Sequence, residues 1–334
     1  MLQLERVELA DVDWCDVDAF ADRSPFQTRE WLDFLAASQG GEPVVARLRD
    51  GSATVGWFSG MIVKRFGVRI LGSPFQGWTT GPMGFNLEPG VDRRAAVDAL
   101  LRFGFKDLRC LHVELLDRRL GFDELDGIRG EAATYESFEL DLTRPEDELF
   151  AAMSSACRRA VRKSEKSEVV VEIATADGFA DEYYEQLEDV FAKQDLRPPY
   201  SVERVRELID HVEPSGRLLL LRALSPDGKR IATAIYPAYN DIAFFWGGAS
   251  WRSDQILRPN EAVFWFAIRE LKRRGIATLD MGGGGEYKRK YGVEEVRLPF
   301  LRASRVRGVT TARNVAQRVY WKVATRRPSL RRAS

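Results

Sequence analysis

The residues most able to do chemistry lie in one stretch, residues 280–292, where four consecutive glycines precede three cations. Glycine costs roughly 1 kcal/mol in regular structure, so a run of four indicates positive φ angles or a ligand pressed against bare backbone. The cations at 288–290 follow where a helix start would offer free N–H groups to an anion. We therefore expect a loop, including Gly283 and Gly284, that binds an anionic or carbonyl-bearing ligand. The alternative is a flexible connection.

A second group of charged residues lies on a predicted helix near the middle of the chain. Arg158, Arg162 and Lys166 are spaced by four residues and therefore share one face of that helix. Arginine binds phosphate or carboxylate through two parallel hydrogen bonds, which suits a nucleotide-linked or lipid diphosphate acceptor or an RNA backbone. We expect Arg158 and Arg162 to bind substrate. The alternative is a solvated face on which Glu165 and Glu168 offset the cations.

Aromatic residues in the second half of the chain are candidates for lining a cleft. Tyr236 and Trp246 lie on the predicted central strands, and Tyr287 follows the glycine run. Such side chains bind a sugar or a peptide through their apolar faces while their polar atoms reach a partner. Each of them alone is also a common core residue.

Length and composition indicate a folded protein of two domains. With 334 residues, either half is long enough to bury its own core. No apolar run reaches membrane-spanning length and the first residues lack the form of a signal peptide, so we expect a cytoplasmic protein. Three isolated cysteines and two histidines supply neither a disulfide framework nor a metal site, and we interpret the cysteines as packing residues.

The C-terminal segment differs in charge from the rest of the chain. The whole sequence has 50 basic and 50 acidic residues, but residues 302–334 hold ten Lys or Arg and no Asp or Glu. Apolar residues share one face of a helix predicted there, namely Val315, Val319, Tyr320 and Val323. Basic amphipathic helices bind anionic membranes or nucleic acid, so we expect peripheral membrane contact through this tail. The alternative is a helix docked on the preceding lobe.

The elements that must position these residues occur in the same order twice. Each half is predicted to contain helical segments, then a three-stranded meander, then a helix that crosses to one more strand. In the first half these elements cover residues 29–37, 43–48, 53–63, 68–71, 91–105 and 111–115, with a loop at 72–90. In the second half they cover residues 179–193, 202–211, 217–223, 230–239, 242–248, 260–274 and 276–280. Duplication of one α/β lobe is the simplest interpretation.

Three motifs, in this order, resemble those of the Fem-type (FemAB-like) acyltransferases, which consist of two lobes of the GNAT acetyltransferase fold. The first is Pro25-Phe26-Gln27-Thr28-Arg29-Glu30-Trp31-Leu32, similar to the opening helix motif of the family. The second joins residues 138–142 to the arginine-rich segment 158–163, and the third is residues 280–292. The resemblance covers nearly the whole chain. It implies an α/β (α+β) fold in which each lobe has a mixed, mostly antiparallel sheet flanked by helices.

The resemblance also implies boundaries and residue roles. We expect a first GNAT-like lobe at 1–143, a second at 144–304 and a basic helical tail at 305–334. Lys288 matches the lysine that stabilises the acyl-transfer centre in the family, and an ammonium aimed at an oxyanion contributes roughly 3 kcal/mol. Asp280 and Tyr287 belong to the same motif, and we expect both to bind substrate, with Tyr287 against the acyl donor. The sequence identifies no general base.

The sequence bears on the acyl donor as well. GNAT enzymes hold the pyrophosphate of coenzyme A on a glycine-rich turn before the crossover helix. Here the run Gln255-Ile256-Leu257-Arg258-Pro259-Asn260 contains a proline and no glycine. The Fem-type proteins that the chain resembles also lack this turn and take the acyl group from aminoacyl-tRNA. We therefore expect no bound cofactor, and either aminoacyl-tRNA or acyl-coenzyme A as the donor.

Together these features predict a transferase that moves an acyl or aminoacyl group onto an amine of a cell-envelope or polysaccharide precursor. Its partners would be a small-molecule or lipid-linked acceptor and an acyl-donor RNA. Two alternatives remain open: a coenzyme A-dependent N-acetyltransferase, and a non-catalytic binding module that keeps the cleft and uses the basic tail to hold a partner. The replacement Lys288→Met discriminates between enzyme and binding module, because only a binding module should tolerate it.

Overall fold

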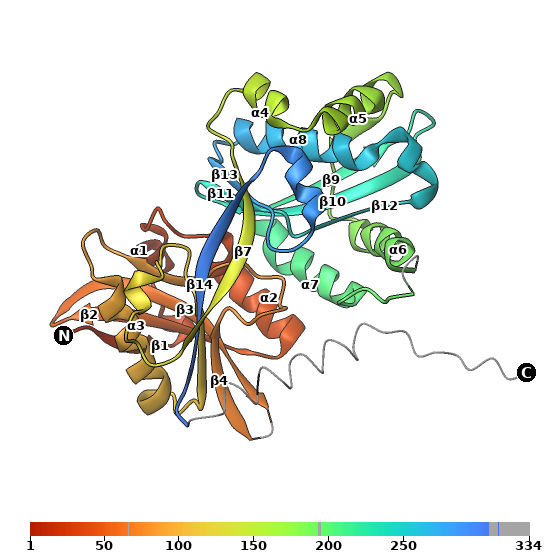
Figure 1. Cartoon of the computed structure of the whole chain (residues 1–334). Helices are drawn as coiled ribbons and strands as arrows, with labels where there is room; N and C mark the ends of the chain where they lie inside the picture. Colours follow the sequence, from red (N-terminus) through yellow and green to blue (C-terminus); the bar gives the residue numbers. More distant parts are fainter. Residues whose placement is uncertain (66, 193–194, 307–312, 314–334) are drawn as a thin grey trace, which may run out of the picture.

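The computed structural model describes residues 1–65, 67–192, 195–306 and 313. They form two lobes that are joined by a long two-stranded ribbon (Figure 1). The described strands make one continuous 14-stranded sheet with the order β1-β2-β3-β4-β6-β14-β7-β13-β11-β10-β9-β8, in which β5 pairs with β3 and β12 pairs with β10. Within the described residues, no helix combines the length and the apolar character that crossing a membrane would need.

The first lobe begins with antiparallel strands and ends with a crossover. Its strands are β1 (Gln3–Val7), β2 (Glu42–Asp50), β3 (Ala53–Arg65), β4 (Val68–Ser73), β5 (Gly84–Leu87) and β6 (His112–Leu116). Helix α3 (Arg93–Arg102) leads into β6, which runs parallel to β4. Helices α1 (Trp14–Asp18) and α2 (Arg29–Gln39) precede the meander. Helix α2 starts where Thr28 accepts a hydrogen bond from the N–H of Trp31, and it ends at Gly40, whose φ of 64° suits glycine.

The second lobe repeats this plan. Its strands are β8 (Val170–Ile173), β9 (Leu218–Leu224), β10 (Arg230–Tyr239), β11 (Ile242–Phe244), β12 (Gly247–Ser250) and β13 (Thr278–Asp280). Helix α8 (Pro259–Arg273) crosses to β13, which runs parallel to β11. Helices α4 (Glu146–Ala152), α5 (Ser155–Lys166) and α8 cover one face, whereas α6 (Phe179–Ala192) and α7 (Val202–Val212) cover the other (Figure 1). The predicted mixed, mostly antiparallel sheets flanked by helices are confirmed.

The two lobes exchange their last strands. Strand β7 (Glu131–Asp141) follows β6 in the sequence but pairs with β13 of the second lobe. Strand β14 (Glu294–Ser304) follows β13 but pairs with β6 of the first lobe, from Phe300↔Leu116 to Ser304↔His112. Between these ends β7 and β14 pair with each other and form the ribbon between the lobes. Each lobe therefore uses a strand from the other half of the sequence.

The lobes also share a hydrophobic core. One cluster of buried residues contains Trp31 and Leu35 of α2 together with Val205 and Leu208 of α7. Phe26, from the first motif, packs on Trp31 and on Phe244 of β11, with ring centroids 4.6 and 4.2 Å apart. That motif therefore joins the two lobes. Because burial of these side chains depends on both lobes, the lobes should unfold together.

Several local features differ from the predicted elements, and β1, β14, α1 and α4 were not predicted at all. Strand β5 lies inside the region that we predicted as a loop. The strand predicted at 242–248 is interrupted between β11 and β12, and the helix predicted at 91–105 is α3 followed by a π-helical turn, η3 (Phe103–Asp107). The apolar tail residues that predicted a helix (Val315, Val319, Tyr320 and Val323) lie outside the described part of the chain.

Candidate active site

The glycine loop, residues 282–285, follows β13 and leads into the 3-10 helix η7 (Glu286–Tyr291). Three of its glycines have φ angles of 68°, 72° and 84°, at Gly282, Gly284 and Gly285, which other residues rarely adopt. Gly283 is needed for a different reason, because a Cβ there would lie 2.6 Å from the carbonyl oxygen of Glu136 on β7. The backbone conformation and the close approach of β7 together explain all four glycines.

Lys288 binds the carbonyl side of this loop. Its side chain is 6 % exposed, and Nζ donates to the carbonyl oxygens of Met281 at 2.6 Å, Gly282 at 3.1 Å and Gly283 at 3.0 Å. An ammonium has three donors, so all are used. Burial lowers the pKa of Lys288 to about 8, although the nearby charge of Asp280 acts in the opposite direction. In this conformation Lys288 fixes the loop, and it would have to release a carbonyl to donate to a substrate.

Asp280 supports the loop from the other side. It is 1 % exposed, and Oδ1 accepts hydrogen bonds from the hydroxyl of Ser137 and from the N–H of Gly282, the latter at 2.7 Å. Arg118 lies 3.7 Å from Oδ2 and forms a two-pronged pair with Glu139 at 2.5 and 2.6 Å. Burial raises the pKa of Asp280 to about 6. Both donors to Oδ1 belong to the protein, so Asp280 supports the loop, and its contact with substrate stays a prediction.

The loop presents main-chain donors that the protein does not use. The N–H of Gly282 is taken by Asp280, and the carbonyls of Met281, Gly282 and Gly283 are taken by Lys288. The N–H groups of Gly284 and Gly285, in contrast, donate to no acceptor within the described residues. Fixed N–H groups of this kind stabilise the negative charge that develops on a carbonyl oxygen during acyl transfer.

The loop lies where two parallel strands separate, which we call the strand fork. Strands β11 and β13 pair from Ile242↔Thr278 to Phe244↔Asp280, and the N–H of Phe245 still donates to the carbonyl of Asp280 at 2.8 Å. Beyond this point the first strand continues into β12, which pairs with β10, while the second enters the glycine loop. Crossover α/β lobes bind ligands at these carboxyl ends of strands.

Tyr287 lies at the strand fork. Its side chain is 55 % exposed, and it is close enough for its charge to raise the pKa of Tyr183 on α6, of Tyr236 on β10 and of Tyr291 on η7. Burial is the larger cause of the raised pKa at each of these three tyrosines. The exposure of Tyr287 next to the glycine loop is compatible with its predicted contact to the acyl donor.

Tyr236 and Trp246 do not line one cleft, and this corrects our expectation. Tyr236 is 1 % exposed and belongs to the core beneath α8, where its ring centroid is 5.5 Å from that of Phe245. Trp246 is 5 % exposed and packs on the opposite face of the sheet, against Tyr200 at 4.9 Å and Tyr183 at 6.3 Å. In the register of β10 with β11, Tyr239↔Ile242 and Ala238↔Ala243, Tyr236 lies opposite Phe245, so the next residue, Trp246, falls on the other face of the sheet.

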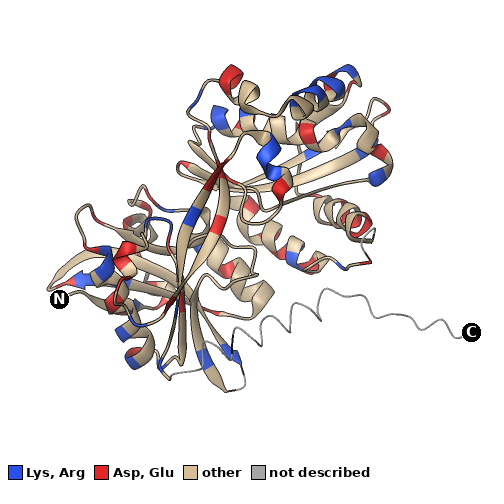
Figure 2. Cartoon of the chain, in the orientation of Figure 1, with Lys and Arg blue, Asp and Glu red and all other residues tan. Residues whose placement is uncertain are grey.

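The two predicted phosphate-binding arginines lie on α5, whose N-cap Ser154 donates its N–H to the carbonyl of Lys290 on η7 at 2.9 Å. Basic residues are distributed along α5 (Figure 2). The guanidinium of Arg158, however, donates to the carbonyl of Ala151 at 2.7 Å and to the carbonyl of Met153, both at the end of α4. Arg162 is exposed and lies 5.4 Å from the ring centroid of Phe150. Among the residues that the structure describes, neither arginine bonds to the glycine loop. Arg158 stabilises the end of α4, and the binding of phosphate by Arg162 stays a prediction.

Sequence reasoning missed the residues that β7 brings to the site. Ser137 and Glu139 reach Asp280 and Arg118 only because β7 crosses from the first half of the chain into the second lobe. Ser137 and Arg118 stand in no motif that we identified, and Glu139 lies in the second motif, where we assigned it no role in the site. To find them from the sequence, one would have needed to recognise that the polar residues of β7 fit those of β13, the strand with which β7 pairs.

Comparisons with known proteins bear on the fold that carries this site. Residues 151–290 match the family described as an acetyltransferase (GNAT) domain, and this range includes the glycine loop and Lys288. A search among curated proteins found no match. Among solved structures, FemX has a TM-score of 0.73 at 12 % identity, over 96 % of this chain and 100 % of that chain.

Two further solved structures have the same arrangement. A tandem GNAT protein from the clavulanic acid biosynthesis pathway has a TM-score of 0.55 at 13 % identity, over 91 % of this chain and 98 % of that one. The C-terminal domain of a putative lysylphosphatidylglycerol synthetase from Agrobacterium fabrum has a TM-score of 0.58 at 10 % identity, over 92 % and 94 %. The chain therefore has the two-lobed GNAT fold of the Fem-type proteins that its motifs resemble, with an acetyltransferase-type domain in its second lobe.

Proposed function

We propose that this chain is an N-acyltransferase or aminoacyltransferase whose reaction takes place at the strand fork of the second lobe. The observation that carries the proposal is the glycine loop, in which Lys288 binds three carbonyls while the N–H groups of Gly284 and Gly285 have no acceptor in the described residues. The acetyltransferase (GNAT) match over the same residues supports acyl transfer as the reaction class.

The proposed reaction needs a place for one negative charge. The nitrogen of an acceptor amine attacks the carbonyl carbon of an ester or thioester, and the carbonyl oxygen becomes an oxyanion. The amine nitrogen then loses a proton, and the leaving oxygen or sulfur departs and takes up a proton. The unused N–H groups of the loop and the buried charge of Lys288 would stabilise the oxyanion, and each such donor lowers the barrier by roughly 3 kcal/mol.

We propose an ester donor of the aminoacyl-tRNA type in preference to coenzyme A. Pro259, the first residue of α8, has no N–H to offer a pyrophosphate, and Arg258 before it has a φ of 61°. Acyl-coenzyme A remains the second candidate donor, since the domain match is to acetyltransferases. We place the enzyme in the cytoplasm.

For the acceptor we propose an amine of a cell-envelope or polysaccharide precursor. One structural neighbour is named as a putative lysylphosphatidylglycerol synthetase, a name that describes an amino acid joined to a lipid. A lipid-linked acceptor would also give the basic C-terminal tail a role, because that tail would hold the enzyme at an anionic membrane surface.

The test is transfer of a labelled acyl group by the purified full-length chain. Aminoacyl-tRNA and acyl-coenzyme A are each offered with amine acceptors, and the products are read by mass spectrometry. We expect Lys288→Met to lower turnover by about two decades, whereas Lys290→Met, which removes an ion pair of 2.7 Å to Glu261, should change it little. Binding of a donor without transfer, in the wild type, would favour the non-catalytic binding module.

A stability control separates chemistry from folding in this test. Lys288→Met leaves three carbonyl oxygens without their donor, so we expect a loss of about 1–3 kcal/mol in the free energy of unfolding. Activity is therefore compared at a temperature where both variants remain folded by circular dichroism. Unchanged turnover in folded Lys288→Met would remove the catalytic role.

A further inference from the structure

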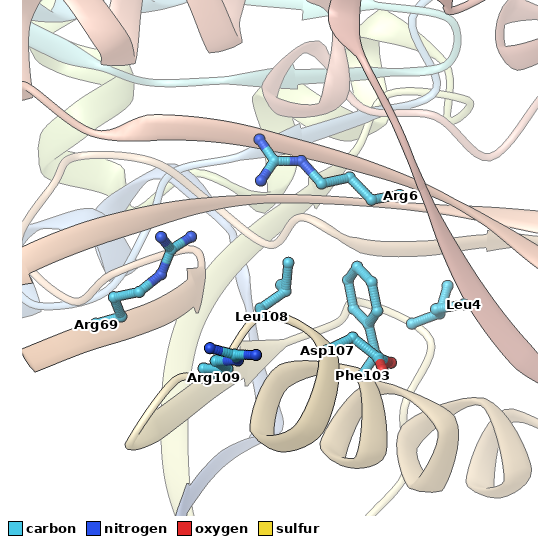
Figure 3. A pocket seen from close by; sticks show the side chains of 7 residues that line it. All are labelled: Leu4, Arg6, Arg69, Phe103, Asp107, Leu108 and Arg109. Carbon is cyan, nitrogen blue, oxygen red and sulfur yellow. The ribbon is translucent and has the colours of Figure 1, made fainter.

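A hollow in the first lobe lies away from the glycine loop. It is a cavity of about 470 Å³, within the range of small-molecule sites (Figure 3). Three elements supply its lining: β1, the start of β4, and the turn η3 with the residues after it. The lining residues are Leu4, Arg6, Arg69, Phe103, Asp107, Leu108 and Arg109.

The position of this cavity separates it from the candidate active site. It lies at the amino ends of β4 and β6, where the N–H of Leu111 donates to the carbonyl of Arg69 at 2.9 Å. The strand fork lies at the carboxyl ends of the corresponding strands in the other lobe. A ligand of this cavity would therefore neither contact nor compete with the reacting groups proposed above.

The charges around the cavity favour an anion. Arg6 and Arg69 share a single carboxylate, that of Glu42, at 2.9 and 3.6 Å. The Nε atoms of both arginines are buried and have no hydrogen-bond partner within the described residues. Arg109 is exposed and forms no ion pair with any residue that the structure describes. Arg6 Nε also lies 3.9 Å from the carboxylate of Glu8. Among the lining residues themselves there are three arginines and one carboxylate, that of Asp107, so the lining is more basic than acidic.

The remaining lining is apolar and rigid. Leu4, Phe103 and Leu108 are each less than 10 % exposed, and Figure 3 shows Phe103 and Leu4 on the side of the hollow away from the guanidinium groups. The π-helical turn that carries Phe103 is closed by the N–H of Leu108, which donates to the carbonyl of Phe103 at 3.0 Å. Such turns are rare and often occur at functional sites.

We propose that this cavity binds a small phosphate ester with a compact apolar or ring-shaped body. Guanidinium groups fit phosphate oxygens through paired hydrogen bonds, and Arg6, Arg69 and Arg109 line one hollow from three elements. The apolar residues take the organic part of the ligand. The inference does not depend on the proposed acyl transfer.

The test is calorimetric titration of the full-length chain with three probes: phenyl phosphate, inorganic phosphate and phenol. We expect phenyl phosphate to bind at one site and more tightly than either fragment, because only it fills both halves of the cavity. Arg109→Gln should weaken phenyl phosphate binding roughly tenfold, since one charge-assisted contact is lost, without changing the unfolding temperature. Arg129→Gln removes an arginine beside Phe105 that does not line the cavity, and it should leave binding unchanged.

Three results would overturn the proposal. They are the absence of any heat of binding with phenyl phosphate, equal affinity in Arg109→Gln and wild type, and loss of binding in Lys288→Met. The last would place the phosphate at the second lobe. Retention of phenyl phosphate binding in Lys288→Met, together with its loss in Arg109→Gln, supports a separate site in the first lobe, whether or not acyl transfer is found.

Discussion

Lys288 connects the proposed chemistry to a measurable titration. Burial lowers its pKa to about 8, so the ammonium is charged below that pH and loses its proton above it. Acyl transfer that depends on this charge should decline as the pH rises through about 8. Lys288→Arg keeps its charge over the whole range, because arginine titrates above pH 12, and should lack the decline although its turnover is lower.

The measurement is kcat/KM between pH 6 and 10 for both proteins. Dividing kcat/KM of the wild type by kcat/KM of Lys288→Arg cancels the effect of the acceptor amine's titration, which is the same for both proteins. A ratio that stays constant through pH 8 would contradict an electrostatic role of Lys288. Its remaining role would be structural, namely to hold the glycine loop.

Asp280 gives a prediction for stability. Its folded pKa of about 6 lies above the usual value near 3.9, because burial disfavours the carboxylate. The folded state therefore binds the proton more tightly, and the stability that this adds is complete below about pH 4 and is lost as the pH rises through about 6. The difference of roughly two pKa units corresponds to about 3 kcal/mol.

Asp280→Asn keeps an oxygen that accepts from Gly282 and Ser137 but removes the titration. Between pH 4 and pH 7, we expect the free energy of unfolding of the wild type to fall by up to about 3 kcal/mol relative to that of this variant. Urea unfolding at several pH values measures the difference. Parallel stability curves for the two proteins would show that Asp280 does not titrate in this range.

At the scale of residues, the sequence alone located the glycine loop and Lys288, because their signal is a local run of unusual residues. It did not identify Ser137 or Arg118, which reach Asp280 from distant positions. Tyr236 and Trp246 were wrongly grouped in one cleft, because a strand pattern does not give the register of β10 with β11, which puts them on opposite faces of the sheet.

At the scale of elements, most helices and strands were predicted within a few residues, since their apolar periodicity is local. Strand β5 was missed because it has only four residues within a Gly/Pro-rich region. It forms by pairing with β3, from Gly56↔Leu87 to Ser59↔Gly84, and nothing in its own sequence specifies that partner. Short strands depend on their neighbours more than on their own propensity.

The contact between β7 and the glycine loop gives a prediction at this scale. In Gly283→Ala the new Cβ would lie 2.6 Å from the backbone oxygen of Glu136, so one of the two elements must move. We expect a loss of about 1–3 kcal/mol in unfolding free energy and a loss of acyl transfer. Gly228→Ala, at a positive φ with open space around it, should cost about 1 kcal/mol and leave transfer intact.

Urea unfolding and the transfer assay measure both effects of Gly283→Ala. If this variant were as stable and as active as Gly228→Ala, the close packing of the loop on β7 would not be needed for the site.

At the scale of the whole molecule, the repeat was visible in the sequence but the exchange of β7 and β14 was not. Each strand pairs with a partner from the other half of the chain, and local patterns do not carry such long-range register. The exchange matters for function, because it puts Ser137 and Glu139 of the first half beside the loop of the second.

Arg313, within the basic tail, contacts the first lobe. Arg313 pairs with the carboxylate of Glu114 on β6, which is fully buried, and the side chain of Arg313 is only 19 % exposed. Removing one partner of a buried pair leaves an uncompensated charge and costs roughly 3 kcal/mol. A truncation that removes Arg313 would therefore disturb the fold as well as the tail, and a test of membrane binding must retain this residue.

The last prediction concerns the cations beyond Arg313, which we propose bring the enzyme to an anionic surface. Each cation near such a surface contributes about 1 kcal/mol, and salt screens the attraction beyond roughly 8 Å. Replacing Arg318, Lys322, Arg326 and Arg327 by Gln should abolish sedimentation with phosphatidylglycerol vesicles at low salt but preserve transfer to a water-soluble amine. Arg313→Gln, as the matched single change, should lower stability yet keep most vesicle binding. Vesicle binding that persists in the fourfold variant would assign the surface attraction to the folded lobes instead of the tail.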